Sequence, residues 1–125
     1  MNFSKEEKRV ALNKFYKASG VEILDKVIKE KSKVMRLYPS KVSYRAQKTR
    51  WGSCSSEGSL SMNWKLVFSP PESLEYVVIH ELAHLQFQDH SKNFWSLVKK
   101  YSPDYKFHSD WLKKNLYEIE SYQFK

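Results

Sequence analysis

The sequence predicts an α+β fold, with helices at both ends of the chain and a small antiparallel sheet of three strands between them. Residues 1–39 carry apolar side chains at helical spacing, and residues 41–68 alternate between apolar and polar side chains as strands do. From residue 69 the chain returns to helical spacing. A length of 125 residues suits one domain, so we expect a single domain over residues 1–125.

The N-terminal part predicts two helices separated near Ser19 and Gly20. In the first, apolar residues are loosely spaced among charges. The second starts at Val21 and repeats apolar residues at i, i+3, i+4 and i+7, which is typical of an amphipathic helix. It should end near Tyr38, because Pro39 disfavours helical backbone at the residue before it.

Three strands are expected in the middle of the chain. Residues 49–54 predict the second strand, and Gly58 supplies the turn that leads into the third. The alternating apolar residues are Val42, Tyr44 and Ala46 in the first strand and Leu60, Met62 and Trp64 in the third.

A further helix is expected from Ser69, which can cap it. Pro70 suits the first helical position, and Glu72 lies three residues after the cap, as in a capping box. Apolar residues surround most of this helix, which predicts that it is buried. The next helix should begin after a cap at Ser91, and residues 102–104 should separate it from the last one.

The composition indicates which kinds of partner and which cellular compartment to expect. Lys and Arg total 22 against 14 Asp and Glu, a formal charge of +8. This balance favours anionic partners such as a nucleotide or nucleic acid, although a solvated basic surface is an equal alternative. The single cysteine, Cys54, excludes an intrachain disulfide. The chain shows no apolar signal core and no span near the roughly 18 apolar residues of a membrane helix, so we expect a cytoplasmic protein without a membrane partner.

The motif H-E-x-x-H at His80, Glu81 and His84 carries the chemistry. Residues four apart lie on one helical face, about 6 Å apart along the axis, so both imidazoles can bind one Zn²⁺ ion. Glu81 lies at the flank of that face and can take a proton from a zinc-bound water. Burying these three groups without partners costs several kcal/mol, roughly, whereas a metal would satisfy them.

A hydrolytic zinc site needs a third protein ligand. His90 follows His84 by six residues, the spacing of the metzincin motif H-E-x-x-H-x-x-G-x-x-H. Phe87 occupies the glycine position, and Asp89 is an alternative turn residue because Asp tolerates unusual backbone angles. The rival ligands are His108, Glu118 and Glu120.

At these residues the sequence resembles the YgjP-like metallopeptidase family, which is related to the SprT and WLM zinc proteases. The matching pieces are RWGSCSSEGSLSMNW at 50–64, PPESLEYVVIHELAHLQFQDHSKNFW at 70–95, YSPDY at 101–105 and WL at 111–112. They define a family-matching core over residues 40–115. Residues 1–39 form a helical extension, where family members usually have a longer, strand-rich region.

The resemblance implies a zincin-like fold and a zinc-dependent peptidase acting on a peptide or protein. It implies that the zinc ligands are His80, His84 and His90, and that Glu81 is the catalytic acid/base. It also implies that an edge strand holds the substrate, and we expect residues 61–66 to be that strand.

Four further residues are candidates for transition-state or substrate contacts. Arg50 can stabilise a developing oxyanion, and Asn63 is expected near the cleft. Tyr101 and Tyr105 can donate hydrogen bonds in the transition state. A solvated or structural role is the alternative for each.

Two other functions stay open. Some members of the resembled family are described as nucleoside triphosphate pyrophosphatases, and the basic charge suits a triphosphate, although no Walker-type glycine loop is present. The related DNA-repair proteases imply a third possibility, a DNA-associated binding module.

Overall fold

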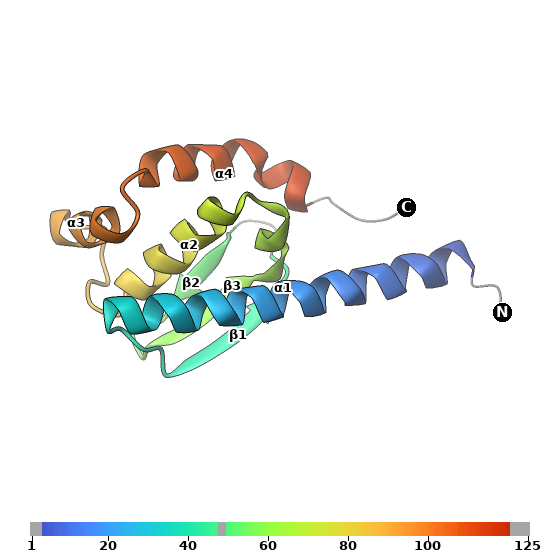
Figure 1. Cartoon of the computed structure of the whole chain (residues 1–125), viewed down its shortest axis with the longest axis horizontal. Coiled ribbons are helices and arrows are strands. Elements are labelled where there is room, and N and C mark those ends of the chain that lie inside the picture. The colour runs from blue at the N-terminus through green and yellow to red at the C-terminus, as the bar shows by residue number, and fades with distance from the viewer. Residues whose placement is uncertain (1–3, 48–49, 121–125) are drawn as a thin grey trace.

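The structure, a computed structural model, describes residues 4–47 and 50–120, and of residues 116–120 only the backbone. Its elements are α1 (Lys5–Met35), β1 (Lys41–Arg45), β2 (Gly52–Cys54), β3 (Ser59–Asn63), a 3₁₀ helix η1 (Trp64–Phe68), α2 (Pro71–Ala83), α3 (Lys92–Tyr101) and α4 (Tyr105–Glu120). Helix α2 is central and contacts α1, α3, α4, η1 and β2 (Figure 1). The predicted α+β class is confirmed.

The sheet is mixed, so the predicted all-antiparallel sheet is wrong in one of its pairings. The strand order is β1-β3-β2. β2 and β3 form an antiparallel hairpin with Gly58 in the turn, as expected, whereas β1 runs parallel to β3. The physical reason is that alternation reports which face a side chain occupies and is the same for both strand directions.

Helix α1 is continuous where two helices were predicted. Gly20 lies in its interior and packs against η1, where a Cβ atom would lie 2.6 Å from the carbonyl oxygen of Trp64. The glycine therefore permits close approach and does not end the helix. The helix ends at Met35, and Arg36 follows in the left-handed conformation with φ 57°.

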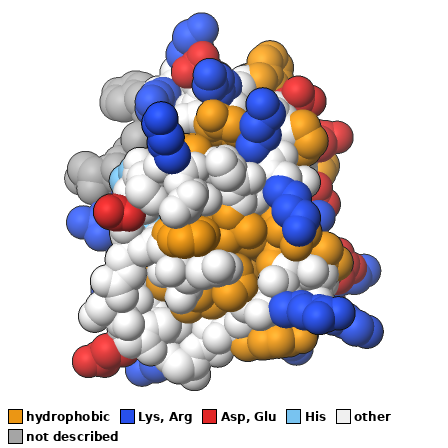
Figure 2. All heavy atoms as spheres, turned by 90° about the vertical axis from the view of Figure 1, so that its left-hand side faces the viewer, with side chains coloured by type: hydrophobic (Ala, Val, Ile, Leu, Met, Phe, Trp, Pro, Cys, Tyr) orange, Lys and Arg blue, Asp and Glu red, His pale blue; other side chains and the backbone are white. Residues whose placement is uncertain are grey.

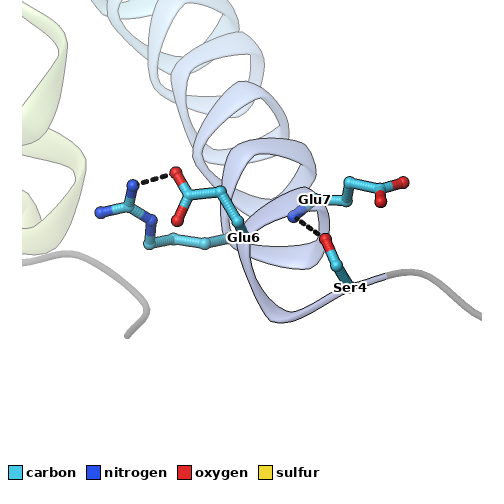
Figure 3. Close-up of polar contacts among 4 residues, drawn as sticks. Ser4, Glu6 and Glu7 are labelled. Atoms are coloured by element: carbon cyan, nitrogen blue, oxygen red, sulfur yellow. Dashed lines mark hydrogen bonds and ion pairs between the residues drawn. The ribbon is translucent and has the colours of Figure 1, made fainter.

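The first turn of α1 is capped by a side chain (Figure 3). The Ser4 hydroxyl oxygen accepts a hydrogen bond from the Glu7 backbone N–H at 3.1 Å. Glu6 forms an ion pair with Arg9 one turn later. Two acidic residues in this turn also suit the positive end of the helix dipole.

Helix α2 begins without the predicted serine cap. The Ser69 hydroxyl instead donates to the Leu66 carbonyl oxygen at 2.6 Å and closes η1. Pro70 occupies the cap position and makes no side-chain hydrogen bond, and Pro71 starts the helix. The expected burial of α2 is confirmed, since most of its side chains are buried.

The last two helices agree with the sequence prediction. Ser91 caps α3 by accepting from the Phe94 N–H at 3.3 Å. Phe94 and Val98 are fully buried against the core. Ser102 ends the helix, and α4 begins at Tyr105.

The surface at the α3 end of the molecule carries hydrophobic side chains at its centre, with Lys and Arg side chains dispersed around them (Figure 2). On this face the positive charge is therefore not gathered into one groove. None of the helices in the described part of the chain has the length and apolar character needed to cross a membrane.

Candidate metal centre

The last turns of α2 place two histidines on one face of the helix. His80 and His84 are four residues apart, and their ring centroids lie 5.0 Å apart. Both are half-buried at the end of a helix that packs in the core. Their predicted placement on one face of a buried helix is confirmed.

The connection between α2 and α3 brings a third imidazole to this face. The His90 ring centroid lies 5.3 Å from that of His80 and 4.8 Å from that of His84. The candidate ligand nitrogens of the three residues all lie within 4.8 Å of one another. In a tetrahedral zinc site with Zn–N bonds of about 2.0–2.1 Å, two ligand nitrogens lie about 3.3 Å apart. To bind one ion, the three nitrogens would therefore approach one another by up to about 1.5 Å through rotation of their side chains.

The connection that brings His90 back to the two α2 histidines contains no glycine. Phe87, at the metzincin glycine position, donates its N–H to the Ala83 carbonyl oxygen at 3.0 Å and continues the helical turn. Among the described non-glycine residues, only Arg36 has a positive φ, so Asp89 does not adopt the unusual conformation that was considered for it. Ordinary backbone angles bring His90 into place.

Each α2 histidine has a partner for its Nδ1 atom. His84 Nδ1 lies 3.0 Å from the Phe87 carbonyl oxygen, and because a carbonyl only accepts, the ring N–H donates to it. His80 Nδ1 lies 3.4 Å from the Tyr76 hydroxyl. Contacts of this kind fix the ring orientation and leave Nε2 as the ligand atom.

The surroundings keep the two α2 imidazoles neutral. Burial, together with the smaller effects of the neighbouring His84 and His90, lowers the pKa of His80 to about 3. Burial also lowers the pKa of His84. Neutral imidazole is the form that binds a metal.

Glu81 lies beside this group on α2 and is 7% exposed. It packs against β2, where a Cβ atom on Gly52 would lie 3.1 Å from Glu81 Cγ. Burial raises the pKa of Glu81 to about 7, while the positive charge of Arg50 acts in the opposite direction. A carboxyl group whose pKa lies near neutrality can accept and return a proton.

A cavity of 160 Å³ opens beside His80 and Glu81. Its walls include the side chains of Trp51, Tyr76, Val77 and Leu112. The site therefore has an apolar recess directly next to its ionisable group.

The remaining predicted contact residues have different positions. Asn63 is buried and structural: its amide donates to the carbonyl oxygens of Gln47 at 2.9 Å and Arg50 at 3.3 Å, so it does not line a cleft. Its strand, β3, is the central strand, so the expectation that residues 61–66 form the edge is wrong. The edge strand beside α2 is β2.

The two candidate tyrosines, Tyr101 and Tyr105, differ in the residues that their rings contact. Tyr105 stacks on Trp95 with centroids 5.1 Å apart, and Trp95 stacks on His90 at 5.8 Å. Tyr101 instead has the Lys100 ammonium over its ring, 5.4 Å from the centroid. Only Tyr105 is therefore linked to the histidine group by described ring contacts.

The rival ligands do not join the group in the described part of the chain. His108 Nδ1 lies 3.2 Å from the Ser73 hydroxyl, and its ring stacks on Tyr76. The side chains of Glu118 and Glu120 lie outside the described residues.

Sequence reasoning missed Tyr76 and Gly52. A signal for Tyr76 existed, because it precedes His80 by four residues and so lies on the same helical face. Gly52 gave no local signal, since its closeness to Glu81 depends on how the sheet packs against α2.

The donor set suits zinc. Three imidazoles form a typical ligand set for Zn²⁺ at a catalytic site, with a fourth position left for water or substrate. The apolar rings beside them, such as Phe94 stacked 4.4 Å from His84, offer no competing donors. The residues present therefore fit the metal that this chemistry requires.

Together, the family match described next and the histidine group define a class of protein, the metallopeptidases. Within it, the chain belongs to the YgjP-like metallopeptidase domain family, whose sequence model matches residues 2–115. The match includes α1 as well as the sheet and the site. Membership of this family implies a divalent metal, usually zinc, and a peptide or protein substrate.

Two solved structures are similar in fold. The metallopeptidase zymogen abylysin of Pyrococcus abyssi gives a TM-score of 0.66 at 24% identity, over 74% of this chain and 94% of that one. The metallopeptidase zymogen jannalysin of Methanocaldococcus jannaschii gives a TM-score of 0.64 at 19% identity, over 74% of this chain and 96% of that one. No curated protein sequence matches the chain.

Proposed function

We propose that the chain is a zinc-dependent peptidase in which His80, His84 and His90 hold one zinc ion. The observation that carries this proposal is the convergence of their ligand nitrogens within 4.8 Å. The hydrogen bond from His84 to the Phe87 carbonyl and the contact of His80 with Tyr76 support it, because they occupy both Nδ1 atoms and leave the Nε2 atoms to bind the metal.

Glu81 is the general base in this proposal. When bound, zinc would supply Lewis acidity, lowering the pKa of a water and polarising the peptide carbonyl. Glu81 accepts the proton of the attacking water on its carboxylate and returns it to the leaving amide nitrogen. Its burial and its pKa near 7 favour both directions of transfer. Arg50 is the candidate to stabilise the developing oxyanion, because its positive charge is close enough to lower the pKa of Glu81.

The peptide substrate lies along the edge strand β2 in this proposal. Within residues 4–47 and 50–120, β2 pairs with β3 on one side only, which leaves its other edge available for strand addition. Its first residue, Gly52, lies against Glu81, so a chain added there passes the histidine group.

A Glu81→Gln variant tests the mechanism. Glutamine keeps the shape of the side chain and cannot accept the proton, so we expect peptide hydrolysis to fall about 100- to 10,000-fold. Zinc content, measured by atomic absorption, should stay at one ion per chain. Glu72→Gln, in the exposed first turn of α2, is the matched control and should keep full activity. Full activity in Glu81→Gln would disprove this role.

The nucleotide-hydrolase and DNA-module alternatives stay predictions that no observation favours. The cavity beside Glu81 has largely apolar walls and does not resemble a triphosphate site. Lys and Arg side chains are dispersed on the face seen in Figure 2.

A further inference from the structure

The cavity beside Glu81 joins the proposed reaction centre to an apolar wall. His80 and Glu81 belong to the reaction centre, whereas Trp51, Val77 and Leu112 are the large apolar lining residues. Gly52, Tyr76, Ser109 and Lys113 complete the lining. A side chain bound in the cavity would therefore belong to a residue whose own backbone lies at the reacting bond.

We infer that this cavity selects the substrate residue next to the scissile bond, and that it prefers a medium-sized apolar side chain such as Leu, Met or Phe. The inference rests on the proposed function and adds a substrate class to it. It concerns the walls of the cavity and not the metal ligands.

The size of the cavity supports this range of side chains. An apolar cavity of about 150 Å³ holds one benzene ring, and this one measures 160 Å³. A phenyl or isobutyl group therefore fits in it, whereas an alanine methyl leaves most of it empty. Full burial of a Leu or Phe side chain corresponds to a preference over Ala of about tenfold to a hundredfold.

The chemistry of the walls excludes acidic side chains from the preferred set. A substrate carboxylate in the cavity would lie beside Glu81, itself 7% exposed, and would be desolvated next to a like charge. The exposed Lys113 also lines the cavity. A flexible surface ammonium remains hydrated and offsets little of this cost.

Val77 offers a test in two directions, because its side chain contributes to the wall. Val77→Leu reduces the cavity by about one methylene and should lower the Phe-to-Ala ratio of kcat/KM at least about threefold. Val77→Ala enlarges it and should raise the ratio for Trp over Leu. Val78→Ala is the matched control, since Val78 is the next residue of α2 and is fully buried but does not line the cavity. It carries a comparable packing cost and should leave both ratios unchanged.

The ratios are measured with zinc-loaded protein on peptides that differ only at the residues flanking the cleaved bond. A second readout does not need hydrolysis. The dissociation constants of the same peptides for Glu81→Gln, measured by calorimetry, should show the same order of preference. Because Ser109 is a half-buried lining residue, Ser109→Leu also reduces the cavity and replaces Val77→Leu if that variant does not fold.

The outcomes separate this inference from the proposed function. Equal cleavage and binding of Ala and Leu peptides would overturn the inference and leave the peptidase proposal standing. Equal changes of the kcat/KM ratios in the Val77 and Val78 variants would also overturn the inference and leave the peptidase proposal standing. Absence of any cleavage or peptide binding by folded, zinc-loaded wild-type protein would overturn both.

Discussion

At the scale of single residues, the site depends on side chains that orient the histidines as well as on the histidines themselves. The Tyr76 hydroxyl lies 3.4 Å from His80 Nδ1, one turn earlier on α2. The Tyr76 ring is buried between His80 and His108, with centroids 5.8 and 6.2 Å away. Helix spacing brings Tyr76 to the face of His80, and contact with α4 then holds the ring in place.

We expect His90→Ala to lower zinc affinity by more than the roughly 10- to 100-fold typical of residues that only orient a ligand. The reason is that His90 supplies one of the three converging nitrogens. Competition titration with a chromophoric chelator measures the change. His108→Ala is the control, because that imidazole contacts Ser73 and Tyr76 instead. If His108→Ala lost the zinc and His90→Ala kept it, the ligand assignment would be reversed.

Tyr76→Phe should lower zinc affinity about tenfold, at the weaker end of the range for orienting residues, because the contact with His80 is long at 3.4 Å. The ring and its packing are kept, so the unfolding midpoint of the metal-free protein should change little. The same competition titration, read beside a thermal melt with chelator present, separates the two effects. An unchanged affinity would mean that the hydroxyl does not position His80.

At the scale of elements, α1 and α2 form their helices for different reasons. α1 begins with a serine cap and is 31 residues long, and its buried residues form one stripe that starts only at Gly20. Its N-terminal part extends beyond the core (Figure 1). α2 lacks a side-chain cap and is held by burial on most sides. Packing therefore replaces capping where a helix lies in the interior.

Gly20→Ala tests the close approach of α1 to η1. A Cβ atom there would lie 2.6 Å from the Trp64 carbonyl oxygen, which is backbone and cannot rotate away. We expect a net loss of about 1–3 kcal/mol in the free energy of unfolding, despite the better helix propensity of alanine. Urea denaturation measures it. Ser19→Ala, the preceding residue of the same helix, should stay within about 0.5 kcal/mol. An equal or higher stability for Gly20→Ala would show that α1 can move away from η1.

At the scale of the whole molecule, the proposed metal centre joins segments that are separate in the chain. Two of the proposed ligands come from the end of α2 and the third from the connection to α3, while β2 packs against Glu81 and α4 lines the cavity. An ion bound there links these elements in the folded state alone.

Zinc should therefore stabilise the whole domain. At a free concentration of 100 times the dissociation constant, binding adds about 2.7 kcal/mol, which for a chain of this length raises the melting temperature by roughly 10 °C. Differential scanning fluorimetry with zinc and then with excess chelator measures this shift. The double variant His80→Ala/His84→Ala should show none. An equal shift in that variant would place the bound zinc elsewhere.

The sequence by itself determined the features that depend on neighbours along the chain. The spacing of His80 and His84, the position of Glu81 beside them and the α+β class all follow from local periodicity, because helix geometry sets which residues share a face. The cap at Ser91 follows in the same way, from a short-range hydrogen bond. The sequence motif also suggested His90, although its spacing lacked the expected glycine.

Only the tertiary structure decided the features that depend on packing between distant segments. These include the parallel pairing of β1, the burial of Asn63, the contact of Gly52 with Glu81 and the cavity walled by Trp51 and Leu112. Alternation along a strand is the same for either direction of its partner, and a glycine in a helix can mark a break or a close approach. Such choices depend on which elements meet, and the energy that decides them comes from burial across the whole molecule.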